Sequence, residues 1–194
     1  MISAAILAGG RAVRFGGRDK GSLSIDGRTI FDRQIGELSQ VAEEILVVGD
    51  AVPRSGVRAV ADLMPGCGPL GGVHTALTEA RGDVTLVVGC DMPFVTAGFL
   101  AHLASLCQHA DAVVPQTEGG YHPLCAAYSR GCLEPVARRL AAGLLKMTDL
   151  FADVRVRVVT LNEVAVFGDP GQLLANVNSP ADYDRIEALH SQEL

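Results

Sequence analysis

The chain of 194 residues has the length of one domain, which would bury about 70% of the surface that its unfolded form exposes. Hydrophobic residues make up 48% of the chain, charged residues 20% and aromatic residues 5%, with 22 glycines and no tryptophan. This composition excludes a disordered, collagen-like or coiled-coil protein. The apolar runs are far shorter than the about 20 residues of a membrane-spanning helix, and the N-terminus lacks the basic lead of a signal peptide. We therefore expect a cytoplasmic protein without a membrane partner.

Charge is distributed unevenly along the chain. The formal net charge is −6, from 16 basic and 22 acidic residues, but residues 11–20 hold four basic residues against one acidic residue. A nucleic-acid-binding protein needs a broad basic face, which no other segment offers, so we expect no nucleic-acid partner. A short cationic segment instead suits a small phosphate compound.

Five cysteines are scattered along the chain. None has the C-x-x-C spacing of a zinc or redox site, and an odd number of thiols cannot all pair. We therefore expect reduced thiols that are mostly buried as small apolar residues.

Apolar, strand-like runs alternate with amphipathic, helix-like segments, without a repeat or a linker. This alternation predicts an α/β fold, a single-domain Rossmann-like three-layer sandwich over residues 1–194 with a mostly parallel central sheet. The strand at 83–88 should be central, because its apolar run is typical of a strand buried on both faces. The expected strands cover residues 2–8, 22–25, 44–48, 57–61, 83–88, 111–115, 122–128 and 154–160, and the expected helices cover residues 29–40, 70–80, 96–106, 131–142 and 179–189.

The strand at 2–8 leads directly into a loop with the sequence LAGGRAVRFGGRDK over residues 7–20. Gly9 and Gly10 let backbone N–H groups approach an anion, and Arg14 and Lys20 can place positive charge on phosphate oxygens. One such ion pair at about 4 Å contributes about 4 kcal/mol at intermediate dielectric, before desolvation. The alternative, a solvated basic loop, would not need two glycine pairs. The Walker A spacing is absent, which excludes a P-loop NTPase.

Asp91 directly follows the segment predicted to be the central strand. In open α/β sheets, ligands bind in the crevice beyond the carboxyl ends of the strands. A carboxylate there can hold Mg²⁺, an ion that keeps several waters and bridges one or two carboxylates to substrate phosphates. The alternative is a turn or capping aspartate, because Asp-Met-Pro is also good turn chemistry.

Residues 66–71 form a literal G-x-G-x-x-G, and Asp91 follows Gly71 by 20 positions, as in a dinucleotide-binding fingerprint. The fingerprint requires its turn immediately after a strand. Here the expected strand ends near residue 61, so nicotinamide or flavin binding is the weaker interpretation.

Four motifs together resemble one family. The loop at 7–20 has the pattern LAGG-x3-R-x-GG-x-DK, which resembles the nucleotide-binding signature of the molybdenum cofactor guanylyltransferases, the MobA family of the nucleotidyltransferase superfamily. GPLGG at 68–72, CDMPF at 90–94 and NVNSP at 176–180 resemble later motifs of that family and occur in the same order. The resemblance extends from residue 4 to about residue 189.

This resemblance implies an Mg²⁺-dependent transfer of GMP from GTP to molybdenum-bound molybdopterin, with release of pyrophosphate. It assigns the metal to Asp91, and catalytic charge neutralisation to Asp91, Lys20 and Arg14. Asp62 and the loop at 68–71 would hold the guanine and ribose, Asn176 and Asn178 would line the cofactor side, and His122 is a further pocket candidate. The resemblance also implies transient contacts with cofactor-synthesis proteins and recipient molybdoenzymes. The expected binding residues are Leu7, Ala8, Gly9, Gly10, Lys20, Asp62, Gly68, Pro69, Leu70, Gly71, Asp91, Asn176 and Asn178.

Three alternatives stay open. A CTP-dependent cytidylyltransferase is the closest, and guanine is favoured because Gly16-Gly17 before Asp19-Lys20 resembles the guanylyl branch. A sugar-nucleotide pyrophosphorylase shares the first loop but usually has a longer chain. A non-catalytic GTP- or cofactor-delivery module would keep the loop without turnover. Gly49 stands where many relatives carry a side chain, so a nucleotide contact there would be through the backbone.

Overall fold

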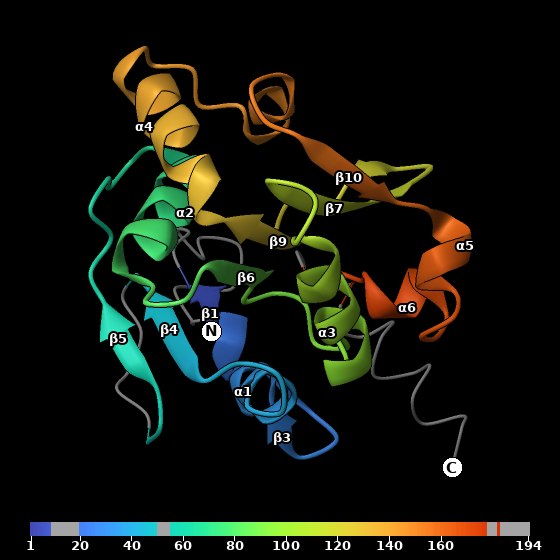
Figure 1. Cartoon of the computed structure of the whole chain (residues 1–194). Coiled ribbons are helices and arrows are strands. Elements are labelled where there is room, and N and C mark those ends of the chain that lie inside the picture. Colours follow the sequence, from blue (N-terminus) through green and yellow to red (C-terminus); the bar gives the residue numbers. More distant parts are fainter. Residues whose placement is uncertain (9–19, 50–54, 178–181, 183–194) are drawn as a thin grey trace.

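The computed structural model describes residues 1–8, 20–49, 55–177 and 182 (Figure 1). An eight-stranded sheet lies at its centre, with strand order β10-β7-β9-β6-β1-β4-β5 and with β8 paired to β7. A separate two-stranded sheet joins β2 and β3. The strands are β1 (Ile2–Leu7), β2 (Ser24–Ile25), β3 (Arg28–Thr29), β4 (Glu44–Val48), β5 (Arg58–Val60), β6 (Val84–Gly89), β7 (Ala112–Thr117), β8 (Gly120–Tyr121), β9 (Cys125–Ser129) and β10 (Val156–Val159).

Most neighbouring strands of the large sheet are parallel. β1 pairs in parallel with β4 and β6, β4 with β5, and β7 with β10. β9 is antiparallel to both β6 and β7, and β8 is antiparallel to β7. The predicted mostly parallel α/β sheet is therefore confirmed, with β9 as a reversed strand inside it.

Helices cover both faces of this sheet. α1 (Ile30–Leu38) and α3 (Ala97–Leu106) pack on one face, while α2 (Gly68–Glu79) and α4 (Leu133–Ala141) pack on the other (Figure 1). The core is split accordingly, because β1 sends Ala4 and Ile6 into one buried cluster and Ala5 and Leu7 into the other. This alternation is the period of two of a strand, and it confirms the predicted three layers.

The strand predicted to be central is β6, which lies between β1 and β9 and is buried from its second residue onward. The structure corrects three predictions at element ends. The strand expected at 22–25 is only Ser24–Ile25, because Lys20–Ser22 forms a 3₁₀ helix. The strand expected at 122–128 begins only at Cys125, because the Cys125 N–H donates to the His122 carbonyl in a turn (3.0 Å). The helix expected at 131–142 begins with a 3₁₀ turn, Arg130–Cys132, before α4.

Further short elements follow α4: a 3₁₀ helix, Met147–Ala152, and the helices α5 (Leu161–Val164) and α6 (Pro170–Leu173). The Thr160 and Glu163 side chains form a reciprocal capping box at α5, which stabilises one turn that is too short for a periodic pattern. The helix expected at 179–189 lies outside the described residues. Within the described part of the chain, no helix is long and apolar enough to cross a membrane.

The five cysteines are free thiols, as predicted, and three of them are buried. Burial raises the pKa of the Cys107, Cys125 and Cys132 thiols to about 12. These three residues therefore act as small apolar side chains of the core.

Candidate active site

The site lies at the switch point of the sheet, where later strands are added on the opposite side of β1. After β1 the chain adds β4 on one side of that strand, and β6 lies on its other side, so the carboxyl ends of β1 and β6 meet with Leu7 opposite Gly89. A crevice beyond such a switch point is the usual ligand site of an open α/β sheet. Leu7 ends β1 at this edge and Ala8 follows it, while their contact with a nucleotide stays a prediction. The Leu7 side chain packs towards α2, where an added Cβ on Gly72 would lie 3.1 Å from it.

Asp91 lies in a tight turn at the end of β6. The Met92 N–H donates to the Gly89 carbonyl (3.2 Å) and closes the turn, and the Val177 N–H donates to the Asp91 carbonyl (2.8 Å). The carboxylate packs over Gly89, where a Cβ would lie only 2.7 Å from Asp91 Oδ1. Glycine at this strand end therefore leaves the space that the Asp91 side chain occupies.

A cavity of about 230 Å³ opens beside this turn. It brings together Asp91, Pro69 and Asn176, which come from three separate sequence motifs. The Asn176 segment is held in place by the Val177–Asp91 hydrogen bond. The residues that line this cavity, called the Asp91 cavity below, are Pro69, Asp91, Met92, Tyr121, His122, Pro123, Leu124, Met147 and Asn176.

The N-terminus of α2 borders the Asp91 cavity through Pro69. Among the described residues no side chain caps this helix end, so the N–H groups of its first turn, which Pro69 lacks, can meet an anion. Gly68 has a φ of +62°, which favours glycine, and a Cβ on Gly71 would lie 2.7 Å from the Met64 carbonyl. The Leu70 side chain is fully buried in the core, so a nucleotide contact by Leu70 would use its backbone.

The Asp62 carboxylate forms hydrogen bonds to residues of its own loop and of α2. Its Oδ1 accepts hydrogen bonds from the Met64 N–H (2.9 Å) and the Thr75 hydroxyl (3.0 Å). These bonds shape the loop that leads from β5 to α2, and the residues lining the two described cavities do not include Asp62. Its assignment to the guanine and ribose end stays a prediction.

The predicted basic loop is described only from Lys20 onward. Lys20 begins a 3₁₀ helix, Lys20–Ser22, whose Gly21 packs directly against the Phe31 ring of α1, leaving no room for a Cβ. This contact fixes the backbone of the Lys20 segment beside the sheet. Gly9, Gly10, Arg14 and Asn178 lie outside the described residues, so their assignments also stay predictions.

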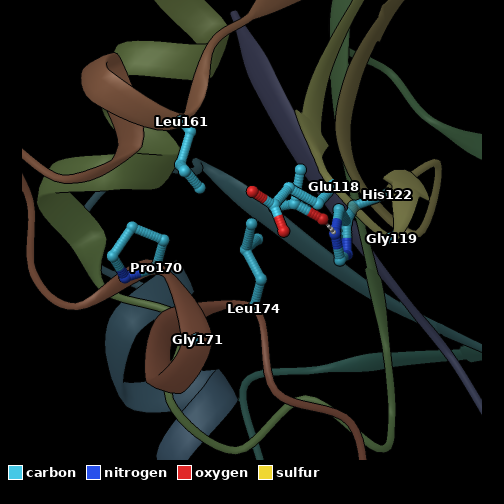
Figure 2. A pocket seen from close by; sticks show the side chains of 8 residues that line it. Glu118, Gly119, His122, Leu161, Pro170, Gly171 and Leu174 are labelled. Atoms are coloured by element: carbon cyan, nitrogen blue, oxygen red, sulfur yellow. Dashed lines mark hydrogen bonds between the residues drawn. The ribbon is translucent and has the colours of Figure 1, made fainter.

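A second cavity, of about 290 Å³, adjoins the first through His122 (Figure 2). Figure 2 shows the Glu118 and His122 side chains opposite the apolar side chains of Leu161 and Leu174. His122 Nε2 lies 2.9 Å from the Thr117 hydroxyl, and burial lowers the pKa of the imidazole, which favours its neutral form. This cavity, called the Glu118 cavity below, is lined by Thr117, Glu118, Gly119, His122, Leu161, Pro170, Gly171 and Leu174.

Sequence reasoning identified His122 as a pocket candidate but missed Glu118 and Tyr121. Both lie at the β7–β8 hairpin, which reaches the site only because β8 folds back on the end of β7. The one local signal was the Gly119-Gly120 pair, since Gly120 has a φ of +109° and forms the hairpin turn.

Comparison with known proteins identifies the family. Residues 4–159 match the model of the MobA-like NTP transferase domain. This chain belongs to the MobA-like NTP transferase family. It is a nucleotidyltransferase, and the predicted family resemblance is confirmed.

Named relatives of this MobA-like protein extend over nearly its full length. A probable molybdenum cofactor guanylyltransferase of Pelotomaculum thermopropionicum is 35% identical over 180 residues, which are 91% of this chain and 87% of the relative. A molybdenum cofactor guanylyltransferase of Desulfosudis oleivorans is 31% identical over 96% of this chain and 95% of its own. The crystal structure of molybdopterin-guanine dinucleotide biosynthesis protein A from Archaeoglobus fulgidus has the same fold, with a TM-score of 0.83 and 24% identity over 98% of this chain and 99% of that chain.

The side chains of the MobA-like site suit Mg²⁺, which takes few protein ligands, better than a metal ion held by three or more protein side chains. The described residues contain no group of three or more His, Cys, Asp or Glu side chains able to hold an ion. The Asp91 cavity instead offers the carboxylate of Asp91 and the amide of Asn176. Hard oxygen donors in this small number suit Mg²⁺, which completes its coordination with water and substrate phosphates.

The structure also disfavours the rival dinucleotide fingerprint. β5 ends at Val60 and α2 begins at Gly68, so residues 61–67 separate the strand from the helix. A dinucleotide-binding turn follows its strand directly. The glycines at 66–71 therefore lack the strand–turn geometry of a nicotinamide or flavin site.

Proposed function

We propose that this protein is a molybdenum cofactor guanylyltransferase, which transfers GMP from GTP to the terminal phosphate of molybdenum-bound molybdopterin. The observation that carries the proposal is the convergence of Asp91, Pro69 and Asn176 on one cavity at the switch point of the sheet. The names of the full-length relatives support the choice of substrates. A cytoplasmic location, and transient contacts with cofactor-synthesis proteins and recipient molybdoenzymes, belong to the same proposal.

The nucleophile of this reaction is supplied by the substrate. A phosphate oxygen of molybdopterin attacks the α-phosphorus of GTP, and a new P–O bond forms. The bond between the α-phosphorus and the oxygen bridging to the β-phosphate breaks, and pyrophosphate leaves with that electron pair. Because the attacking phosphate is already ionised, no general base is required. Catalysis then consists of positioning two anions and neutralising their charge.

Asp91 is the residue that we expect to hold Mg²⁺, which when bound would offset phosphate charge and orient the reacting oxygens. The uncapped N-terminus of α2, at Pro69, adds the positive end of a helix dipole beside the same cavity. Lys20 and Arg14 are proposed to offset further phosphate charge. The backbone of residues 7–10 is proposed to hold the nucleotide.

The two cavities suggest where the acceptor lies. They adjoin at His122, so an acceptor whose phosphate reaches Asp91 can extend its ring system into the Glu118 cavity. The apolar side chains of Leu161 and Leu174 suit the faces of a flat ring, and the Glu118 carboxylate suits N–H donors on its edge. A neutral His122 between the cavities would add no positive charge that draws the phosphates away from Asp91 towards the pterin end.

Thermal unfolding with GTP, CTP or NADH, each with and without Mg²⁺, tests the nucleotide assignment. A ligand at 100 times its Kd stabilises the native state by about 2.7 kcal/mol, or a Tm rise of about 5 to 10 °C for a chain of this size. We expect the largest rise with GTP and Mg²⁺, and a loss of the Mg²⁺ effect in Asp91→Asn.

A larger rise with CTP would transfer the proposal to cytidylyl transfer. Stabilisation by NADH alone would contradict the proposed nucleotide site. Stabilisation by GTP without any turnover would favour the non-catalytic delivery module.

A further inference from the structure

Gln34 is a fully buried polar residue on the core-facing side of α1. The buried neighbours on this helix, Phe31 and Leu38, belong to the apolar core. An amide at such a position loses its hydration, so it destabilises the fold unless protein groups replace the lost hydrogen bonds. The partners of Gln34 therefore indicate what it does.

The amide nitrogen of Gln34 bridges the two ends of the turn that carries Asp91. Nε2 donates to the Gly89 carbonyl (2.7 Å) and to the Met92 carbonyl (2.9 Å), which are 55 and 58 positions away in the sequence. Gly89 and Met92 are also the residues whose backbone bond closes this turn. Because both partners are acceptors, only the NH₂ end of the amide can serve them.

In the described part of the chain, the other end of the amide lacks a matching partner. Gln34 Oε1 is buried and has no hydrogen-bond partner among the described residues. An unpaired buried acceptor destabilises a fold, and an apolar side chain of similar shape would avoid it. The two donated bonds are therefore the contribution that sets Gln34 apart from an apolar residue at this position.

Backbone hydrogen bonds hold the remaining sides of the turn. The Cys90 N–H donates to the Leu7 carbonyl of β1 (3.2 Å), and the Val177 N–H donates to the Asp91 carbonyl (2.8 Å). Gln34 supplies the contact from α1, so the turn is fixed to β1, to the 175–177 segment and to the first helix. Together these contacts fix the backbone that carries the Asp91 side chain.

We propose that Gln34 is a positioning residue for the transfer reaction, which acts by holding the Gly89–Met92 turn so that Asp91 faces its cavity. This inference rests on the proposed function, because it requires Asp91 to take part in the reaction. When catalysis depends on positioning, a displacement of about 1 Å lowers the rate about 100-fold. A support that fixes such a residue therefore controls turnover without touching the substrate.

The test compares Gln34→Met with the matched control Leu38→Met, which introduces the same side chain one helical turn later at another fully buried position. Methionine fills the space of glutamine without a donor, and it removes the unpaired oxygen. For Gln34→Met we expect kcat to fall at least about tenfold, KM for GTP to stay within about twofold, and half-saturating Mg²⁺ to rise. Leu38→Met should leave all three values unchanged.

Asp91→Asn separates a failure of this inference from a failure of the proposed function. If wild-type protein shows no Mg²⁺-dependent transfer, or Asp91→Asn keeps full turnover, the proposed function fails. If both behave as expected while Gln34→Met keeps the wild-type kcat and Mg²⁺ requirement, the positioning role of Gln34 alone is refuted. A kcat loss that Leu38→Met shares would also refute it.

Gln34→Glu provides a second variant if Gln34→Met does not fold. A protonated glutamic acid can donate one hydrogen bond to the turn, whereas the ionised form can donate none, and burial favours the neutral form. Even the protonated acid replaces only one of the two donated hydrogen bonds, so the kcat of Gln34→Glu should lie below that of the wild type at both pH 6 and pH 8, with folding checked at both values. A wild-type kcat at both pH values in the folded variant would contradict the positioning role.

Discussion

Replacing Gly89 with alanine would move the Asp91 carboxylate with little effect on the fold. The added Cβ would lie 2.7 Å from Asp91 Oδ1, and its next contacts, at Leu124, are ordinary ones of 3.6 Å or more. Since ordinary contact begins at 3.4 Å, the carboxylate oxygen has to retreat by about 0.7 Å. The fold should be retained, because the clash is with the end of a side chain and not with backbone.

Activity should respond much more strongly. A misplacement of about 1 Å lowers a rate that depends on positioning about 100-fold, so a retreat of this size predicts a loss of about tenfold to 100-fold in kcat. This corresponds to about 1.4 to 2.7 kcal/mol of transition-state stabilisation. The assay is steady-state pyrophosphate release with GTP, Mg²⁺ and molybdenum-bound molybdopterin, beside thermal unfolding of the same samples.

Gly98→Ala is the matched control for Gly89→Ala. Among the described residues, a Cβ there would meet Phe167 Cδ1 alone, at an ordinary distance of 3.7 Å, and alanine favours the helix by up to about 1 kcal/mol over glycine. The control should keep its kcat and its Tm should stay the same or rise. Wild-type kcat in Gly89→Ala would refute the argument that the position of the Asp91 carboxylate limits the reaction.

Three further outcomes are expected. Hydrogen bonds from the Thr160 backbone and then from the Arg157 side chain lower the pKa of Glu163 from 4.5 to about 2. The charged carboxylate therefore stabilises the fold fully above pH 4.5, and this stabilisation is lost as the pH falls towards 2. The Tm difference between wild type and Glu163→Gln should narrow over that range, and a constant difference would contradict it. Glu118→Gln should raise KM for molybdopterin about tenfold while KM for GTP is unchanged, and equal effects on both would reject the pterin assignment of that cavity. Because burial raises the pKa of the Cys125 thiol to about 12, native protein should resist alkylation by iodoacetamide at Cys125 at pH 8, unlike the partly exposed Cys67.

Local patterns were sufficient to predict most of the fold. The strand predicted at 44–48 has the bounds of β4, and the apolar run at 83–88 correctly indicated a strand in the middle of the sheet. Because ligands of open α/β sheets bind beyond the carboxyl ends of the strands, the sequence also predicted that Asp91 lies at that edge of the sheet. These predictions succeed because burial on both faces of a parallel sheet leaves a continuous apolar run in the sequence.

The parts that escaped prediction depend on contacts across the chain or on capping. Gln34 reaches carbonyl groups 55 and 58 positions away, and no local pattern reports such a pair. Glu118 joins the site only through the reversed β7–β8 hairpin. The short helix α5 follows a Thr-x-x-Glu capping box, which was a readable signal, but four residues are too few for a helical period.

Transfer of label from [α-³²P]GTP tests the central claim most directly, because the α-phosphate stays with the transferred GMP. With molybdenum-bound molybdopterin and Mg²⁺, wild-type protein should form a labelled pterin dinucleotide and release one pyrophosphate for each transfer, whereas Asp91→Asn should form almost none. Faster labelling from [α-³²P]CTP than from [α-³²P]GTP, or equal labelling by Asp91→Asn, would contradict the account.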